Sequence, residues 1–171
     1  NTMATMKAVR FHAYGGPEVL VMEEAPRPEA GADEVLVRVR AAGVNPLDWK
    51  VRAGYVKEWL HHRLPLIPGW EVSGVIEAVG AGVGGFQVGD EVYGMLDFSR
   101  DGAYAEYVAT RPGHLASKPK SVEHLQAAAV PLAALTAWQA LFEVAGLNPG
   151  QTVLIHAAAG GVGHFAVQLA K

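Results

Sequence analysis

The sequence predicts a mixed fold, with a small β barrel or sandwich in the first two-thirds of the chain and the start of an α/β domain in the last third. The first observation is a series of short strand-like segments separated by Gly and Pro turns. The second is a change near Ser121 to helical segments rich in Ala and Leu. The third is an apolar run at 152–156 that is followed by a glycine cluster and a helical segment. We therefore expect one domain over residues 1–125 and the start of a second over 126–171.

The expected barrel rests on six strand-like segments. The clearest is 34–42, because valine occupies every second position from 35 to 39, which is typical of a half-buried strand. Gly74 indicates a bulge or a close approach of another backbone segment. Asn45 followed by Pro46 predicts the start of a short helix at 45–52. The expected strands are residues 6–11, 19–25, 34–42, 70–79, 91–95 and 103–109.

The last third has the pattern of helices around a buried strand. Ser121 is expected to cap a helix over 121–129, and Gly146 is expected to end a second helix over 132–145. The run at 152–156 shows little alternation, which is typical of a strand buried on both faces of a parallel sheet. A glycine-rich turn and a helix over 164–171 complete the pattern.

Composition excludes several classes of protein. A net charge of −3 argues against a nucleic-acid partner and against a polybasic membrane anchor. The chain has no Cys, so a disulfide, a thiolate zinc site and a cysteine nucleophile are excluded, and a reducing, cytoplasmic location is compatible. No apolar run reaches the roughly 20 residues of a membrane span, so we expect no membrane partner.

Histidine gives no metal signal in this sequence. The seven His residues show no recognised metal-ligand spacing, so we expect no metal site. His61 and His62 are adjacent and therefore point in different directions in regular structure. We interpret them as exposed loop residues.

The segment Ala-Ala-Gly-Gly-Val-Gly at 158–163 lies between an expected strand and an expected helix. A pyrophosphate can approach the N–H groups of a helix N-terminus only where side chains are absent. The last glycine also lets the helix pack closely on the strand. A tight structural turn is the alternative interpretation. We favour a dinucleotide site, whose cofactor-binding residues are Ala159, Gly160, Gly161, Val162 and Gly163.

Five motifs, in order, resemble the zinc-independent quinone oxidoreductase (zeta-crystallin-like) branch of the medium-chain dehydrogenase/reductase superfamily. They are Gly43-Val-Asn45-Pro-Leu-Asp48-Trp-Lys50, Pro68-Gly69-Trp70-Glu71, Gly89-Asp90-Glu91-Val92, Gly102-Ala-Tyr104-Ala-Glu106 and the segment 150–171. The first is similar to enone and alkenal reductases. The resemblance covers nearly the whole chain from Met6. It implies a GroES-like β barrel followed by the start of a Rossmann domain, that is, the N-terminal part of such a protein.

The departures from the superfamily concern zinc. Zinc alcohol dehydrogenases carry a Cys in the region of Gly43 and a Gly-His-Glu motif where this sequence has Gly69-Trp70-Glu71. The structural zinc lobe with its four cysteines is also missing. The resemblance therefore implies a reductase without zinc, in which hydrogen-bond donors and proximity to the nicotinamide assist hydride addition.

The resemblance implies catalytic roles for three residues of one short helix. Asn45 is expected to hold a polar group of the substrate or the nicotinamide ribose, or else to cap the helix. Lys50 is expected to reach the ribose or a substrate oxygen, unless it is a solvated surface residue. Asp48 is expected to orient Lys50 or the ribose. The alternative is that it is an acid in the first turn of the helix, where the helix dipole favours a negative charge. Thr136 resembles the family's Thr at the nicotinamide end of the cofactor, with bonding to its own helical turn as the alternative.

Other conspicuous side chains have structural interpretations. We expect Tyr55, Trp59 and Trp70 to lie in the core, or else to wall a substrate pocket. Glu71 is expected to have a structural hydrogen-bonding role, and His156 to be a hydrogen-bonded core histidine.

The sequence and the resemblance together predict an NADPH-dependent reductase of quinones or α,β-unsaturated carbonyls, with NADH also possible. We expect it to be cytoplasmic and a homodimer at full length. One alternative is an inactive reductase-like protein that binds nucleotide for regulation; another is a scaffold role for the barrel. A third is an enoyl-reductase module of a larger synthase. Because one strand and one helix cannot bury their own apolar faces, we expect 171 residues to be a truncation.

Overall fold

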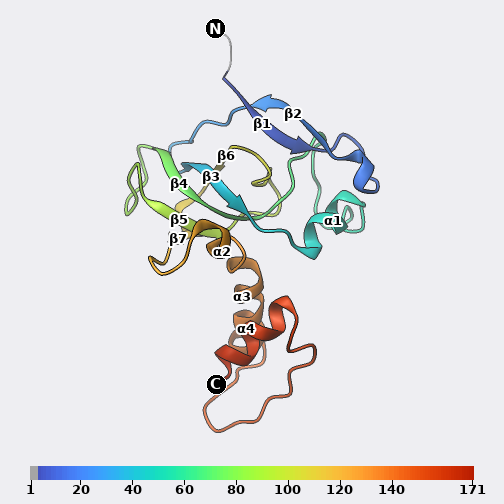
Figure 1. Cartoon of the computed structure of the whole chain (residues 1–171), viewed down its shortest axis with the longest axis vertical. Coiled ribbons are helices and arrows are strands. Elements are labelled where there is room, and N and C mark those ends of the chain that lie inside the picture. Colours follow the sequence, from blue (N-terminus) through green and yellow to red (C-terminus); the bar gives the residue numbers. More distant parts are fainter. Residues whose placement is uncertain (1–3) are drawn as a thin grey trace. The chain divides into compact units, whose positions relative to one another are not determined.

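The computed structural model describes residues 4–171, which form two compact units (Figure 1). The first unit extends to Ala129 and the second is Val130–Lys171. The boundary expected from the sequence lies at 125. The first unit holds all the strands of the described chain, and the second is helical.

The first unit is a five-stranded antiparallel sheet with a separate two-stranded ribbon. The ribbon pairs β1 with β2, and the sheet has the order β6-β3-β4-β5-β7. Isolated bridges join Ala8 to Ala105 and Phe11 to Leu66, so the ribbon lies against the segments that lead into β6 and β4. The strands are β1 (Thr5–Arg10), β2 (Val21–Pro26), β3 (Val35–Ala42), β4 (Glu71–Val79), β5 (Glu91–Met95), β6 (Tyr107–Thr110) and β7 (Leu115–Ser117).

The core of this unit lies between the sheet and the ribbon. Its largest members, Trp70 and Phe11, have no exposed surface. Gly74 of β4 faces Val39 of β3 next to an irregularity in the pairing. A Cβ on Gly74 would lie 2.3 Å from the Arg38 carbonyl oxygen, so the expected close backbone approach is confirmed. The other buried members of this cluster are Val35, Val37, Val51, Leu66, Val72, Ile76, Val92, Leu96, Ala103 and Val108, and a second cluster consists of Met6, Ala8, Ala25 and Ile67.

Helices α1 (Pro46–Arg52) and α2 (His124–Ala127) belong to the same unit. Asn45 is the N-cap of α1, as expected. The N-cap of α2 is Glu123, so the prediction of Ser121 as a cap is wrong. Glu123 donates its backbone N–H to Gln126 Oε1, which satisfies one of the N–H groups at that helix start.

The second unit contains α3 (Pro131–Trp138), a π-helical segment η3 (Gln139–Val144) and α4 (Gly161–Leu169). Helices α3 and α4 lie side by side (Figure 1). Ala137, Leu141 and Ala166 form their shared buried cluster. The expected helix over 132–145 is therefore one α-helix that continues with wider π turns.

No strand forms over 152–156, so that prediction is wrong. Leu154 is 80% exposed there, and Val153 is 39% exposed. A parallel strand needs neighbours that take its backbone hydrogen bonds and cover both of its faces, and no described residues supply them.

One stretch, His124–Val144, is long and apolar enough by composition to cross a membrane. The prediction that no apolar run has that length is therefore wrong. The finding is weak, because core helices of soluble proteins pass the same test. In this structure the stretch is also interrupted between α2 and Pro131, where α3 begins.

Candidate functional site

The first candidate site is the loop that leads into α1. The Asn45 backbone N–H donates to Asp48 Oδ2 at 2.6 Å, which closes the first turn of the helix. The Asn45 side chain donates through Nδ2 to Glu71 Oε2 at 2.7 Å. Asn45 therefore joins the loop before α1 to the first residue of β4.

Asp48 is buried beneath this loop, with 6% of its surface exposed. Burial raises the pKa of its carboxyl, and the hydrogen bonds from Asn45 and Tyr104 oppose that rise. The Tyr104 hydroxyl donates to Asp48 Oδ2 at 3.0 Å. Burial, followed by the neighbouring Asp48 carboxylate, raises the pKa of Tyr104, so the phenol keeps its proton at neutral pH.

Glu71 and Gly43 complete the cluster. Glu71 is 2% exposed, and its backbone carbonyl accepts the Gly43 N–H at 3.0 Å. A Cβ on Gly43 would lie 2.1 Å from Glu71 Oε2. The carboxylate therefore occupies the space that any side chain at 43 would need. The expected hydrogen-bonding role of Glu71 agrees with these contacts.

Lys50 is not part of this cluster. It is exposed, and its Nζ lies 5.8 Å from the centre of the Trp49 ring. Asp48 points into the buried cluster, so the expected orientation of Lys50 by Asp48 is absent from the contacts of the described residues.

The aromatic residues near α1 differ in burial. Trp70 is fully buried and donates its indole N–H to the Arg100 carbonyl at 2.8 Å. Tyr55 is 69% exposed and Trp59 is 80% exposed, so the prediction that they lie in the core is wrong. The Tyr55 ring packs edge-on against the exposed Trp49, with ring centres 5.6 Å apart. The chain ends α1 at a Gly-containing turn here, which leaves these rings outside the sheet.

His62 also differs from its interpretation as an exposed loop residue. Its Nε2 contacts the Phe98 carbonyl oxygen at 2.6 Å, so this nitrogen carries the proton and donates. The ring also lies over Trp70, with centres 5.7 Å apart. Its neighbour His61 is exposed, as expected.

The second candidate site is the start of α4 in the other unit. Gly160 is its N-cap, and Gly160 N–H donates to the Ala157 carbonyl at 2.9 Å. A Cβ on Gly163 would lie 2.1 Å from that same carbonyl oxygen, whereas a Cβ on Gly161 would meet nothing within 4 Å. Gly163 is therefore required by close packing, and Gly161 leaves the helix start open to solvent.

Thr136 and His156 are the two further candidate residues of this unit. The Thr136 hydroxyl donates to the Leu132 carbonyl at 2.7 Å, which is the bond back to its own turn named as the alternative. His156 is exposed, so the prediction of a buried core histidine is wrong. The missing strand at 152–156 explains that exposure.

A family model for the alcohol dehydrogenase GroES-like domain matches residues 31–120, more than half of the chain. The chain belongs to the alcohol dehydrogenase GroES-like family. This match supports the resemblance to the medium-chain dehydrogenase/reductase superfamily. Relatives named quinone oxidoreductase agree with the resemblance to that branch, and solved structures that cover 98% of this chain agree with the mixed fold class. It also accounts for the antiparallel sheet and ribbon of the first unit.

Similar proteins include reductases from plants and bacteria. A chloroplastic quinone-oxidoreductase homolog from Spinacia oleracea is 40% identical over 97% of this chain and 52% of its own length. The 2-methylene-furan-3-one reductase of Solanum lycopersicum is 42% identical over 97% of this chain and 44% of its own. The quinone oxidoreductase structure from Coxiella burnetii superposes with a TM-score of 0.87 and 40% identity, covering 98% of this chain and 53% of that one. The chain thus spans about half the length of the relatives it matches.

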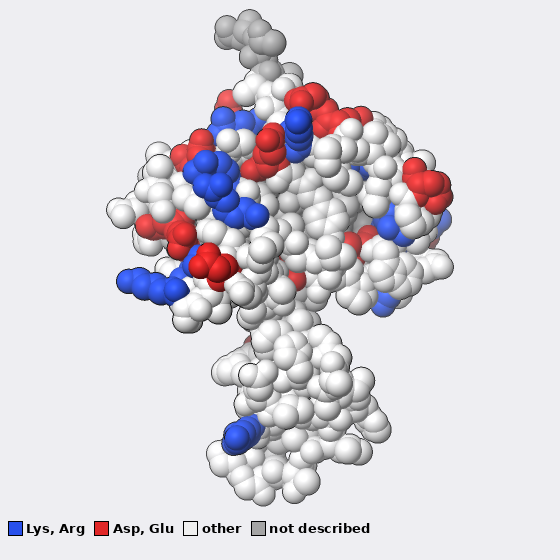
Figure 2. Space-filling view, in the orientation of Figure 1, with Lys and Arg blue, Asp and Glu red and all other residues white. Residues whose placement is uncertain are grey.

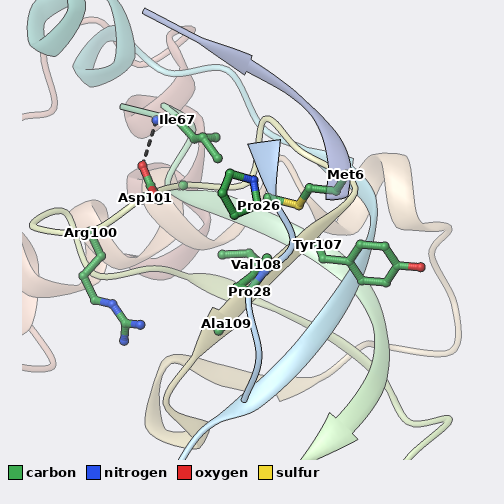
Figure 3. A pocket seen from close by; sticks show the side chains of 10 residues that line it. Met6, Pro26, Pro28, Ile67, Arg100, Asp101, Tyr107, Val108 and Ala109 are labelled. Atoms are coloured by element: carbon green, nitrogen blue, oxygen red, sulfur yellow. Dashed lines mark hydrogen bonds between the residues drawn. The ribbon is translucent and has the colours of Figure 1, made fainter. Parts of the chain in front are cut away.

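The GroES-like unit has a small pocket away from the Asn45 cluster (Figure 3). Its volume is about 150 Å³. The Asp101 carboxylate on its wall accepts the Ile67 N–H at 2.9 Å, and Arg100 pairs with Glu34. Both charged groups are therefore already partnered. The pocket is lined by Met6, Pro26, Pro28, Ile67, Arg100, Asp101, Gly102, Tyr107, Val108 and Ala109.

Surface charge differs between the two units of this family member. Lys and Arg alternate with Asp and Glu over the drawn face of the GroES-like unit (Figure 2). Residues 130–171 contain Glu143 and Lys171 as their only acidic and basic side chains apart from histidine. The drawn face therefore has no large patch of one sign (Figure 2).

Tyr104 is the residue of the cluster that sequence reasoning did not single out. It lies in the motif Gly102-Ala-Tyr104, which contributed to the family resemblance, but no role was predicted for Tyr104 itself. The signal was a polar aromatic residue in an apolar, strand-like segment, because a buried phenol needs a hydrogen-bond partner. Its partner, Asp48, could not be identified from spacing, since 56 positions separate the two.

Proposed function

We propose that this protein is a zinc-independent, NADPH-dependent reductase of quinones or α,β-unsaturated carbonyls. Membership of the quinone oxidoreductase branch supports an oxidoreductase, and the names of the spinach, tomato and Coxiella relatives support these two substrate classes. Because the chain spans about half of each relative, the proposal concerns the whole protein.

The observation that carries the proposal is the bare N-terminus of α4. The start of this nine-residue helix follows a tight turn at Ala157, whose φ is +53°. Gly163 allows the helix to approach that turn, and open space surrounds the Cα of Gly161. This arrangement fits a dinucleotide pyrophosphate, whose charge favours backbone N–H groups and the positive end of a helix. Residues 159–163 would hold it, and Thr136 is proposed for the nicotinamide end.

A reduced nicotinamide, when bound, supplies a hydride to an electrophilic carbon of the substrate, and a proton from solvent completes the reduction. The residues of this chain would bind and orient the substrate and the cofactor. Asn45 is held in place by Glu71 and by its own N–H bond to Asp48, so it is suited to fix a polar group of the substrate or ribose. The exposed rings of Trp49 and Tyr55, which pack edge-on, offer apolar surface at α1 and the turn after it, and exposed Lys50 offers a positive charge.

Zinc independence is part of the proposal. The chain has no Cys, and no group of three or more His, Asp or Glu in residues 4–171 could hold a metal. The donor set around Gly43 also fits poorly, because the Glu71 carboxylate fills the space of a side chain at 43 and already accepts from Asn45. Dialysis of the purified protein against a strong chelator tests this point: unchanged turnover is expected, and a loss that added zinc restores would refute it.

Steady-state turnover of the full-length protein tests the proposed activity. We expect a simple quinone or enone to accelerate NADPH oxidation, with NADH used less well. If neither nicotinamide supports turnover over a panel of both substrate classes, the proposed activity is wrong. Binding of NADPH without turnover would instead favour the regulatory alternative.

The cytoplasmic location and the dimeric state of the full-length protein are also proposals. Cell fractionation tests the location, with which the absence of cysteine is compatible. Light scattering of the full-length protein measures the number of subunits.

A further inference from the structure

Three of the four family motifs in the first unit meet at the side chain of Tyr104. The Tyr104 ring covers Gly69, where a Cβ would lie 2.3 Å from Tyr104 Cδ1. Its hydroxyl reaches Asp48 Oδ2 at 3.0 Å and the Gly43 carbonyl oxygen at 3.4 Å. Three motifs that are separate in the sequence, around Asn45, Gly69 and Tyr104, therefore share one buried contact.

The backbone around Tyr104 is fixed by its own hydrogen bonds. The Tyr104 N–H donates to the Pro68 carbonyl at 3.0 Å, and the Ala103 N–H donates to the Gly69 carbonyl at 2.6 Å. On the other side, the Tyr104 carbonyl accepts the Val9 N–H of β1 at 2.8 Å. The phenol is thus held at a constant position relative to the sheet.

A chain of hydrogen bonds leads from that phenol to Asn45. Tyr104 donates to Asp48 Oδ2, and the same oxygen accepts the Asn45 backbone N–H at 2.6 Å. Asn45 then donates its side-chain N–H to Glu71 at 2.7 Å. A phenol has a single proton to donate, and the carboxylate oxygen is its nearer acceptor.

We propose that Tyr104 is a positioning residue for Asn45, acting through the buried carboxylate of Asp48. The inference deepens the proposed function, because it names the group that fixes the substrate-facing Asn45, and it rests on that function for its effect on rate. Asp48 on this view orients Asn45 rather than Lys50. Removing the phenol hydroxyl leaves the Asp48 carboxylate with one donor fewer and loosens the loop before α1.

Few charged groups face Asp48. Tyr104 and, beyond Asn45, Glu71 lie on its buried side. On its own helix, Lys50 is exposed, and Arg52 donates to the Gly15 carbonyl at 3.3 Å. The pKa of Asp48 is therefore set by burial and by the hydrogen bonds that its carboxylate accepts, first from Asn45 and then from Tyr104.

The test compares Tyr104→Phe with Tyr107→Phe in the full-length protein. Tyr107 is a matched control, because it lies three positions further on and its ring packs on the Arg27 guanidinium, 4.0 Å away. Selective ¹⁵N-asparagine labelling lets the Asn45 amide be followed during a pH titration, since residues 1–171 contain only two other Asn. Thermal unfolding shows that both variants are folded.

We expect Tyr104→Phe to move the titration of Asp48, as reported by the Asn45 amide signal, to higher pH. The reason is that the Asp48 carboxylate has lost a donor that favours its charged form. We also expect kcat to fall about 10- to 100-fold, the size associated with a misplaced substrate-orienting group. Tyr107→Phe should change neither quantity. An Asn45 titration that stays at the wild-type midpoint, or an unchanged kcat, overturns the inference. If the wild-type protein turns over no quinone or enone, the proposed function fails, and the titration alone then decides the inference.

Discussion

Gly43 is the residue whose replacement the structure constrains most tightly near the site. A Cβ there would lie 2.1 Å from Glu71 Oε2 and 2.6 Å from the Ala128 carbonyl oxygen. Both neighbours are held, the first by the hydrogen bond from Asn45 and the second as backbone. Glycine at this position therefore allows the loop before α1, β4 and the end of α2 to meet.

We expect Gly43→Ala to lower the free energy of unfolding by about 1–3 kcal/mol, the usual cost of overpacking a tight interior. Gly84→Ala is the matched control, because a Cβ at 84 would meet no atom within 4 Å. Chemical denaturation monitored by tryptophan fluorescence measures both. Equal stabilities for the two variants would contradict the close contact at Gly43.

The raised pKa of Asp48 predicts an unusual pH dependence of the free energy of unfolding. Its pKa in the folded protein is raised above the ordinary value of 3.8, with burial as the main cause. The folded state therefore binds this proton more tightly than the unfolded state does. Stability from this group is present below the unfolded pKa and is lost as the pH rises through the folded pKa.

Asp48→Asn removes that titration while keeping a side-chain oxygen that can accept from Asn45 and Tyr104. We expect the stability of the variant relative to wild type to increase as the pH rises from about 4 through the folded pKa of Asp48, and then to level off. Denaturation curves at a series of pH values measure the difference. A difference that decreases with pH would have the wrong sign.

At the scale of elements, α2 is attached to the sheet by a buried hydroxyl. Ser73 of β4 has no exposed surface, and its Oγ donates to the Val92 carbonyl at 3.0 Å and contacts His124 Nδ1 at 2.7 Å. The other nitrogen of His124 lies 3.3 Å from Glu91 Oε1. These three side chains have the order of a catalytic triad, but the complete burial of Ser73 makes it a structural contact.

Ser73→Ala should destabilise the protein by about 1–3 kcal/mol, because the Val92 carbonyl and the His124 ring would each lose a buried partner. Ser121→Ala is a suitable control, since Ser121 is exposed and does not cap α2. It should lie within about 0.5 kcal/mol of wild type. Urea denaturation measures both, and a neutral Ser73→Ala would show that α2 is not held in this way.

The start of α4 allows packing and cofactor binding to be separated. We expect Gly161→Ala to leave the fold intact, because its Cβ would meet no atom, and yet to weaken NADPH binding at least about tenfold by blocking the helix start. Gly163→Ala should destabilise the second unit, because its Cβ would lie 2.1 Å from the Ala157 carbonyl. Calorimetric titration and thermal unfolding of the full-length protein distinguish the two. Wild-type NADPH affinity in a folded Gly161→Ala protein would remove the helix start from the cofactor site.

Elements with a strong local signal were predictable. The alternation in β3, the Asn-Pro start of α1 and the glycine turn before α4 all follow from short-range physics and are present. The prediction of a strand at 152–156 is wrong, because a parallel strand depends on partners outside its own segment. The prediction that Tyr55 and Trp59 lie in the core is wrong for a related reason. Aromatic character predicts burial only where a core is available to receive the ring.

At the scale of the whole molecule, the fold was predictable from sequence, but the site was predictable only as separate pieces. The motifs around Asn45, Gly69 and Tyr104 indicate the family, but they do not show that the side chain of Tyr104 joins all three. That contact joins positions 48 and 104, and no local pattern reports a pairing over such a separation. The residues that hold Asn45 could therefore be found only in three dimensions.

We propose that the full-length protein transfers a hydride from NADPH to a quinone or an enone. Isotope transfer tests it most directly: the protein is incubated with NADPH carrying deuterium at the reactive carbon and with a simple enone, and the product is analysed by mass spectrometry. We expect a saturated ketone that contains one deuterium at the carbon that accepted the hydride. The experiment is done twice, with the deuterium on one face of the nicotinamide and then on the other. If no reduced product forms, or if the product lacks deuterium in both experiments, the proposed hydride transfer is wrong.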